Sequence, residues 1–181
     1  MRFWRNLIGY QAVWFASVIA AANGRSWLGA AVAFVFVVGQ LIASSNRTGD
    51  IRLVAVALLF GVAIDGALAS SGWLRYASSH PALIAPIWIL SMWAAFAMTL
   101  NHSLAFLQQR SLWAVALGLL GGPLAYVGAS RGFGVLEFQP PGWRALAALA
   151  FAWAIALPAL AQLAHRWRDI DRTVVVQELS R

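Results

Sequence analysis

The chain has 181 residues, of which 61% are hydrophobic and 10% are charged, and its formal net charge is +7. Soluble domains carry about 25% charged residues, so the composition excludes an ordinary soluble domain and indicates a membrane-embedded protein. The absence of cysteine excludes disulfide bonds and thiolate chemistry.

The basic excess does not indicate nucleic-acid binding. All thirteen cationic side chains are arginines, and they are placed singly between apolar segments. A phosphate backbone needs a clustered basic patch, which this pattern lacks. We therefore expect the arginines to lie in loops near anionic lipid headgroups.

Six segments are apolar over roughly the 20 residues that a membrane-spanning helix needs. The predicted spans are 6–22, 27–44, 53–73, 84–107, 112–130 and 145–165. Because the connections are short, consecutive helices are expected to pack as antiparallel hairpins. The sequence thus predicts an all-α, six-helix transmembrane domain over residues 1–165, with a short cytosolic tail at 166–181.

The first span has an alternative interpretation as a cleavable signal peptide. Arg2 and Arg5 precede it, and Ala20–Ala22 resembles a cleavage site with small residues. However, Tyr10 and Gln11 interrupt the apolar stretch, and five further spans follow. We expect a retained span.

The arginine distribution predicts orientation. Nine of the thirteen arginines fall on the side that holds both chain ends, and four on the other. By the positive-inside rule, both termini are expected in the cytoplasm, with the protein in the bacterial inner (plasma) membrane.

Asp65 lies near the middle of the third span. A charged group there is costly and is expected to face protein or a water-filled cavity. Two roles remain open, namely a proton- or cation-carrying or catalytic acid, and a hydrogen-bonded structural contact between helices.

The fourth span contains a polar stretch, TLNHSL, near its predicted cytosolic end. The first span places polar side chains at a similar depth, so we expect the two to meet. The cluster is predicted to comprise Asn6, Tyr10, Gln11, Thr99, Asn101, His102 and Ser103. It is interpreted either as a hydrogen-bond network between helices or as a ligand or catalytic site.

The fifth span contains Gly121, Gly122 and Pro123 in sequence. Proline removes a backbone donor and clashes with the preceding turn, so a kink is predicted there. Broken helices also form substrate sites in transporters, and that alternative remains open.

The sequence lacks the motifs of several kinds of catalytic and ligand-binding sites. The three histidines are far apart and no cysteine is present, so we expect no metal site and no cofactor. Nucleophile-elbow and phosphate-loop motifs are missing. His102 and Ser103 are no dyad because adjacent helical residues point about 100° apart. The sequence leaves an enzymatic activity undecided, and the missing motifs favour a protein without one.

Four stretches resemble a family of small bacterial inner-membrane proteins, the domain of unknown function 2878. They are NLIGYQAVWF at 6–15, Asp65-Gly66, WAAFAMTLNHSL at 93–104 and GGPLAY at 121–126. The family implies no activity and assigns no residue a role. Genes for such proteins lie near genes resembling lipid methyltransferases and flavin oxidases, so the resemblance implies a link to envelope lipids.

Three function classes follow. The first is an accessory or structural membrane protein of envelope lipid metabolism. The second is a small transporter or channel that uses Asp65 and the Gly122-Pro123 kink, and the third is a lipid-modifying enzyme that uses the His102 cluster. The expected partners are membrane lipids and other membrane proteins, not nucleic acid. The sequence leaves the oligomeric state open.

Overall fold

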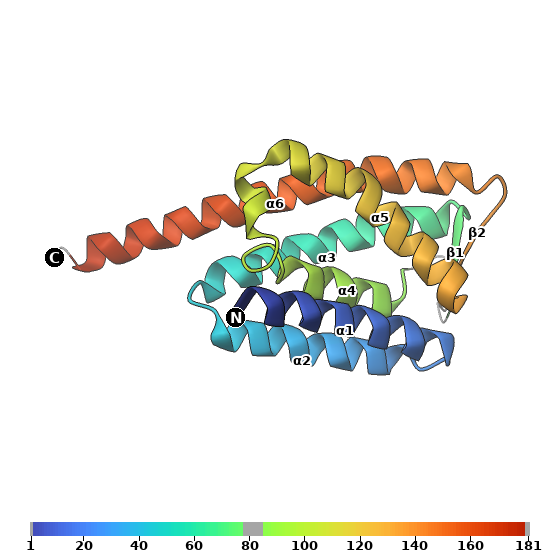
Figure 1. Ribbon diagram of the computed structural model, residues 1–181, viewed down its shortest axis with the longest axis horizontal. Helices are drawn as coiled ribbons and strands as arrows, with labels where there is room; N and C mark the ends of the chain where they lie inside the picture. Colours follow the sequence, from blue (N-terminus) through green and yellow to red (C-terminus); the bar gives the residue numbers. More distant parts are fainter. Residues whose placement is uncertain (1, 78–84, 180–181) are drawn as a thin grey trace.

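The computed structural model describes residues 2–77 and 85–179, with side chains described for residues 3–77 and 85–168. The elements are helices and two short strands (Figure 1), in the order α1 (Arg2–Ala22), α2 (Ser26–Ala43), α3 (Arg47–Ser70), β1 (Leu74–Tyr76), α4 (Ile87–Ala97), η1 (Ala105–Gln109), α5 (Ser111–Phe133), β2 (Leu136–Phe138) and α6 (Trp143–Leu179).

Among the described residues, four helices are long and apolar enough to cross a membrane, judged by length and composition. They are α2, α3, α5 and the part of α6 from Trp143 to Arg168. Helix α1 is long enough but is not among these four, and α4 is a shorter apolar helix. The all-helical class is therefore confirmed, and the count of six spans stays a prediction.

The segment predicted as one helix over 84–107 is interrupted. Helix α4 ends at Ala97, residues 98–104 form turns, and the 3₁₀-helix η1 follows. Residue 84, the predicted start, lies outside the described residues.

Side chains satisfy the backbone carbonyls that the end of α4 releases. Asn6 donates to the carbonyl oxygen of Met98 at 3.1 Å, and Gln108 donates to that of Leu100 at 2.8 Å. An unpaired buried carbonyl costs free energy. These two hydrogen bonds therefore allow helix α4 to end at a buried position.

Strands β1 and β2 form a small antiparallel sheet that the sequence did not predict. Arg75 lies opposite Glu137 in the register, and their side chains form an exposed ion pair at 3.7 Å. The glycines at 72 and 134 end α3 and α5 with positive φ angles of 71° and 63°. These left-handed turns, which glycine adopts without strain, lead the chain into the strands.

Helix α4 lies at the centre, in contact with α1, α2 and α3, while α6 packs between α3 and α5. Figure 1 shows the N-terminus, the α2–α3 connection and the turns after α4 at one end of the bundle, the N-terminal end. The two strands and the α1–α2 connection lie at the opposite, strand end.

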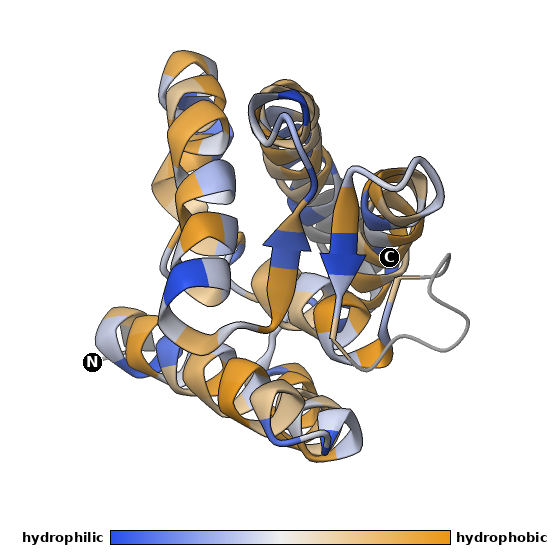
Figure 2. Ribbon diagram, turned by 90° about the vertical axis from the view of Figure 1, so that its right-hand side faces the viewer, coloured by the Kyte–Doolittle hydropathy of each residue, from blue (hydrophilic) through white to orange (hydrophobic). Residues whose placement is uncertain are grey.

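Many large apolar side chains face outward. Phe34, Val35, Leu112 and Phe151 are each more than two-thirds exposed. Figure 2 shows hydrophobic residues on the outer as well as the inner faces of the helices. Apolar helix faces exposed to this extent are stable in contact with lipid and unfavourable in contact with water.

Glycines in α5 allow close contact with α6. A Cβ added at Gly118 would overlap the backbone carbonyl of Trp153, and one at Gly122 would overlap the indole ring. Figure 1 shows α5 changing direction along its length, and Pro123 lies at its middle. The indole of Trp153 thereby lies directly against α5.

Candidate functional site

Asp65 is completely buried and accepts three hydrogen bonds from three different elements. The hydroxyls of Tyr76 and Tyr126 donate to Oδ1 at 2.6 and 2.5 Å, and Trp93 Nε1 donates to Oδ2 at 2.7 Å. Burial, and then the adjacent Asp65 charge, raise the pKa of Tyr76, so its hydroxyl keeps the proton that it donates. The Asp65 cage, as we call these four side chains, therefore ties α3 to β1, α4 and α5.

The cage continues into a group of stacked rings. The indole of Trp93 lies parallel to that of Trp153, with centroids 4.3 Å apart, and Phe96 meets Trp153 edge-on at 5.2 Å. Gly61 makes this position possible, because a Cβ there would lie 2.5 Å from Trp93 Cδ1. A small residue in α3 thus places an indole between Asp65 and α6.

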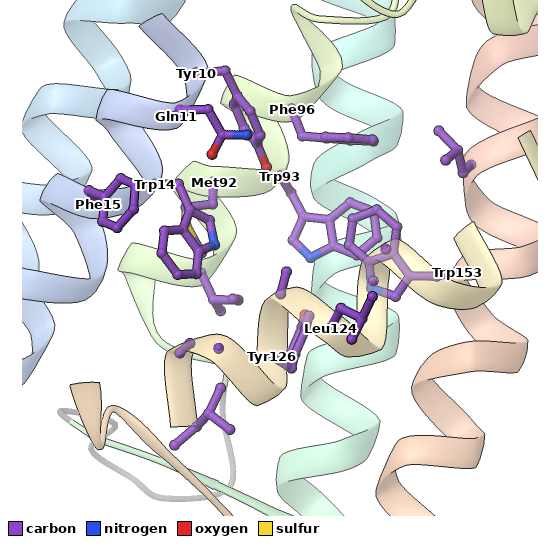
Figure 3. A pocket seen from close by; sticks show the side chains of 18 of the residues that line it. Tyr10, Gln11, Trp14, Phe15, Met92, Trp93, Phe96, Leu124, Tyr126 and Trp153 are labelled. Atoms are coloured by element: carbon purple, nitrogen blue, oxygen red, sulfur yellow. The ribbon is translucent and has the colours of Figure 1, made fainter. Parts of the chain in front are cut away.

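A cavity of about 470 Å³ lies beside these rings, between α1, α4, α5 and α6. Figure 3 shows side chains of α1 on one side and of α5 and α6 on the other. The wall is almost wholly apolar or aromatic. Among its residues are Tyr10, Gln11, Trp14, Phe15, Trp88, Met92, Trp93, Phe96, Leu117, Leu124, Gly128, Tyr126 and Trp153. We call this space the aromatic cavity.

The aromatic cavity has a buried floor and an exposed rim. Trp93 and Tyr126 on the floor are only 2% and 4% exposed. Phe15 and Leu124 on the rim are 49% and 66% exposed, and Leu117 is also exposed. These rim residues lie in the middle of α1 and α5, so the mouth opens on the flank of the bundle and not at an end.

At the N-terminal end, Asn6 joins α1 to the turns after α4. Its Oδ1 accepts from the Ser103 hydroxyl at 2.6 Å and from the Ser103 backbone N–H at 3.3 Å. Its Nδ2 donates to Gln40 Oε1 at 3.2 Å as well as to Met98. One buried amide thus holds α1, α2 and the turn segment together.

A second network centres on Asn101. It donates to Asp50 Oδ1 at 2.6 Å, and its own Oδ1 accepts from Gln108 at 2.9 Å and from Arg168 at 3.2 Å. The other oxygen of Asp50 accepts from Ser44 at 2.5 Å. This chain of hydrogen bonds connects α3, η1 and α6 through the turn segment.

A second cavity, of about 400 Å³, lies at the same end, and we call it the N-terminal pocket. It is lined by Arg5, Asn6, Gly39, Gln40, Ala43 and His102. The Asn6 network fixes the turn segment that carries His102, so the pocket wall is held in place from two sides.

The structure divides the predicted seven-residue cluster among three places. Asn6 and Ser103 bond to each other, and His102 lies with Asn6 in the N-terminal pocket, whereas Asn101 belongs to the Asp50 network. Thr99 donates to the carbonyl of Phe96. Tyr10 and Gln11, one helical turn further along α1, line the aromatic cavity together with Gly121 and Gly122.

Several residues at these places were not singled out from the sequence. Asp50 and Gln108 lie near span ends, where polar side chains usually face solvent, so no local signal distinguished them. Trp93 lies inside a predicted span, where an aromatic side chain gives no signal beyond packing, and its bond to Asp65 depends on a distant helix. Tyr76 lies in a strand that the hydropathy pattern did not predict.

The described residues thus define a helical protein with four helices able to cross a membrane and an aromatic cavity on its flank. The chain belongs to the family described as Protein of unknown function (DUF2878), whose model matches residues 3–159. This match confirms the resemblance noted in the sequence. Searches among curated proteins and among solved structures find no match.

Proposed function

We propose that this protein is a multi-pass inner-membrane protein that binds a lipid-type apolar ligand in the aromatic cavity. In that role it is an accessory component of envelope lipid metabolism, with both termini in the cytoplasm. The supporting observation is the aromatic cavity itself, whose volume is within the roughly 300–1,000 Å³ typical of small-molecule sites.

The position of the mouth favours a ligand that arrives from the bilayer. Phe15 and Leu124 are exposed on the rim, at the middle of helices whose outer faces are apolar. In a membrane that depth is hydrocarbon, so an acyl or isoprenoid chain can enter without crossing water. The few polar groups in the wall, such as the Gln11 amide, suit a ligand that is mainly apolar.

Asp65 fits a structural role in this proposal better than a carrier role. The carboxyl group is fully buried and already accepts three hydrogen bonds, so it offers a moving ion little room. Its cage positions Trp93 and Tyr126, which form the floor of the cavity.

The envelope role is tested by the lipid profile of a strain that lacks the gene, complemented with two variants. In Gly128→Leu the new side chain enters the cavity, since an added Cβ lies 3.9 Å from Trp14 Cη2 and meets nothing closer. In the control, Gly132→Leu, the same side chain lies one turn later on α5, where nothing is within 4 Å.

We expect the deletion to change the lipid profile. Gly132→Leu should restore the profile and Gly128→Leu should not, although both proteins accumulate equally. A deletion strain with an unchanged lipid profile contradicts the proposed role in lipid metabolism. Equal restoration by both variants contradicts the assignment of that role to the aromatic cavity.

A further inference from the structure

We propose that the N-terminal pocket binds a phosphate group. This pocket is separate from the aromatic cavity, and none of its lining residues is shared with it. The proposal therefore does not depend on the proposed lipid ligand.

The charge of the lining residues is the first argument. Arg5 carries a permanent positive charge and presents N–H donors in a planar fork that suits phosphate oxygens. His102 adds an imidazole ring, which can present an N–H donor. Among the described side chains, no carboxyl group lines the pocket.

The hydrogen bonds around the pocket determine what its amides can offer. Gln40 uses its Oε1 to accept from Asn6, so the group that it has left for a ligand is its NH₂ donor. Asn6 is occupied by Gln40, Met98 and Ser103, and it serves to hold the wall. The ligand-facing chemistry is thus rich in donors, which favours an anion with several acceptor oxygens.

The acids of the described residues lie outside the lining of the N-terminal pocket. Among the described side chains, Asp50 is the acid at this end of the bundle, and it is 1% exposed with both oxygens accepting hydrogen bonds. Asp65 is enclosed in its cage, and Glu137 lies in strand β2 at the opposite end. The charged side chain that lines the N-terminal pocket, that of Arg5, is therefore cationic, and these described acids lie outside the lining.

A phosphate group can come from a lipid headgroup or from solution, and two probes distinguish these sources. Purified full-length protein in a neutral detergent is titrated with inorganic phosphate or with dihexanoyl phosphatidic acid, and the melting temperature is followed. A ligand that binds only the folded protein raises this temperature in a saturable manner. A response to both probes identifies phosphate itself as sufficient, and a response to the short-chain lipid alone identifies a lipid headgroup.

The variants are Arg5→Gln and His102→Gln, with Arg25→Gln as a control. Arg25 is also exposed and lies just before α2 at the opposite end, so its loss changes the net charge equally. We expect Arg5→Gln to weaken binding by about tenfold or more, because it removes a charge-assisted hydrogen bond. His102→Gln should also weaken binding, and Arg25→Gln should leave it unchanged.

Three results overturn the proposal. The first is the absence of a saturable rise with either probe. The second is an equal loss in Arg5→Gln and Arg25→Gln, which indicates general charge screening. The third is unchanged binding in His102→Gln, which excludes the turn segment from the site. Arg5 is exposed, so Arg5→Gln tests the site without disturbing the buried core.

Discussion

Removing a single hydroxyl from the Asp65 cage tests how much this group stabilises the fold. Tyr126→Phe keeps the ring in the cavity floor and deletes the donor that lies 2.5 Å from Asp65 Oδ1. Hydrogen bonds to charged acceptors contribute about 1.5–3 kcal/mol, whereas those between membrane helices average about 0.6 and reach about 1.7. Because Asp65 retains two other donors, we expect a loss of about 1–2 kcal/mol.

The assay is thermal unfolding of the purified protein, followed by intrinsic fluorescence. For a chain of this size, 1 kcal/mol shifts the melting temperature by about 2–4 °C, so Tyr126→Phe should lower it by about 2–8 °C. Tyr10→Phe is the matched control. Its ring lines the same cavity and contacts Phe96, but the described part of the chain gives its hydroxyl no hydrogen bond. If the two variants melt at the same temperature, the cage does not stabilise the fold as argued.

The remaining predictions concern packing and the N-terminal network. Gly118→Ala should lower the melting temperature by the equivalent of about 1–3 kcal/mol, because the new Cβ overlaps the Trp153 carbonyl and forces α5 from α6. The Cβ added in Gly132→Ala meets nothing within 4 Å, so this control should be neutral or stabilising by up to about 1 kcal/mol. A loss of stability equal to that of Gly118→Ala would refute the packing argument. In denaturant titrations, Asn6→Ala should destabilise the protein more than Ser103→Ala. The first substitution removes every hydrogen bond of the Asn6 amide, whereas the second removes one hydrogen bond. The reverse order would contradict the proposed hydrogen-bond network.

Most of the helices could be predicted because their signal is local. An apolar run of sufficient length between polar turns predicts a helix whatever its neighbours are. Helices α2 and α5 begin and end within a few residues of the predicted ranges, and α3 begins six residues before its predicted start. The end of α4 depends on distant partners instead. Asn6 donates a hydrogen bond to the turn segment at Met98, 92 residues away in the sequence. The hydropathy pattern does not indicate this hydrogen bond.

The candidate site shows the same division. An acid in the middle of an apolar span predicts a buried polar contact, and the structure buries Asp65 completely. Its partners could not be named, because Tyr76, Trp93 and Tyr126 come from separate elements whose packing brings them together. The aromatic cavity was likewise not predicted, since it is formed by side chains of α1, α4, α5 and α6, which are far apart in the sequence.

The central claim, that the aromatic cavity holds a lipid-type ligand, is tested most directly by native mass spectrometry of the protein released from detergent. We predict one tightly retained apolar adduct on the wild-type protein and on Gly132→Leu, and its loss from Gly128→Leu, in which the leucine side chain takes up part of the cavity. A wild-type protein with no retained adduct, or a Gly128→Leu variant that retains it as well as the control, would contradict the claim.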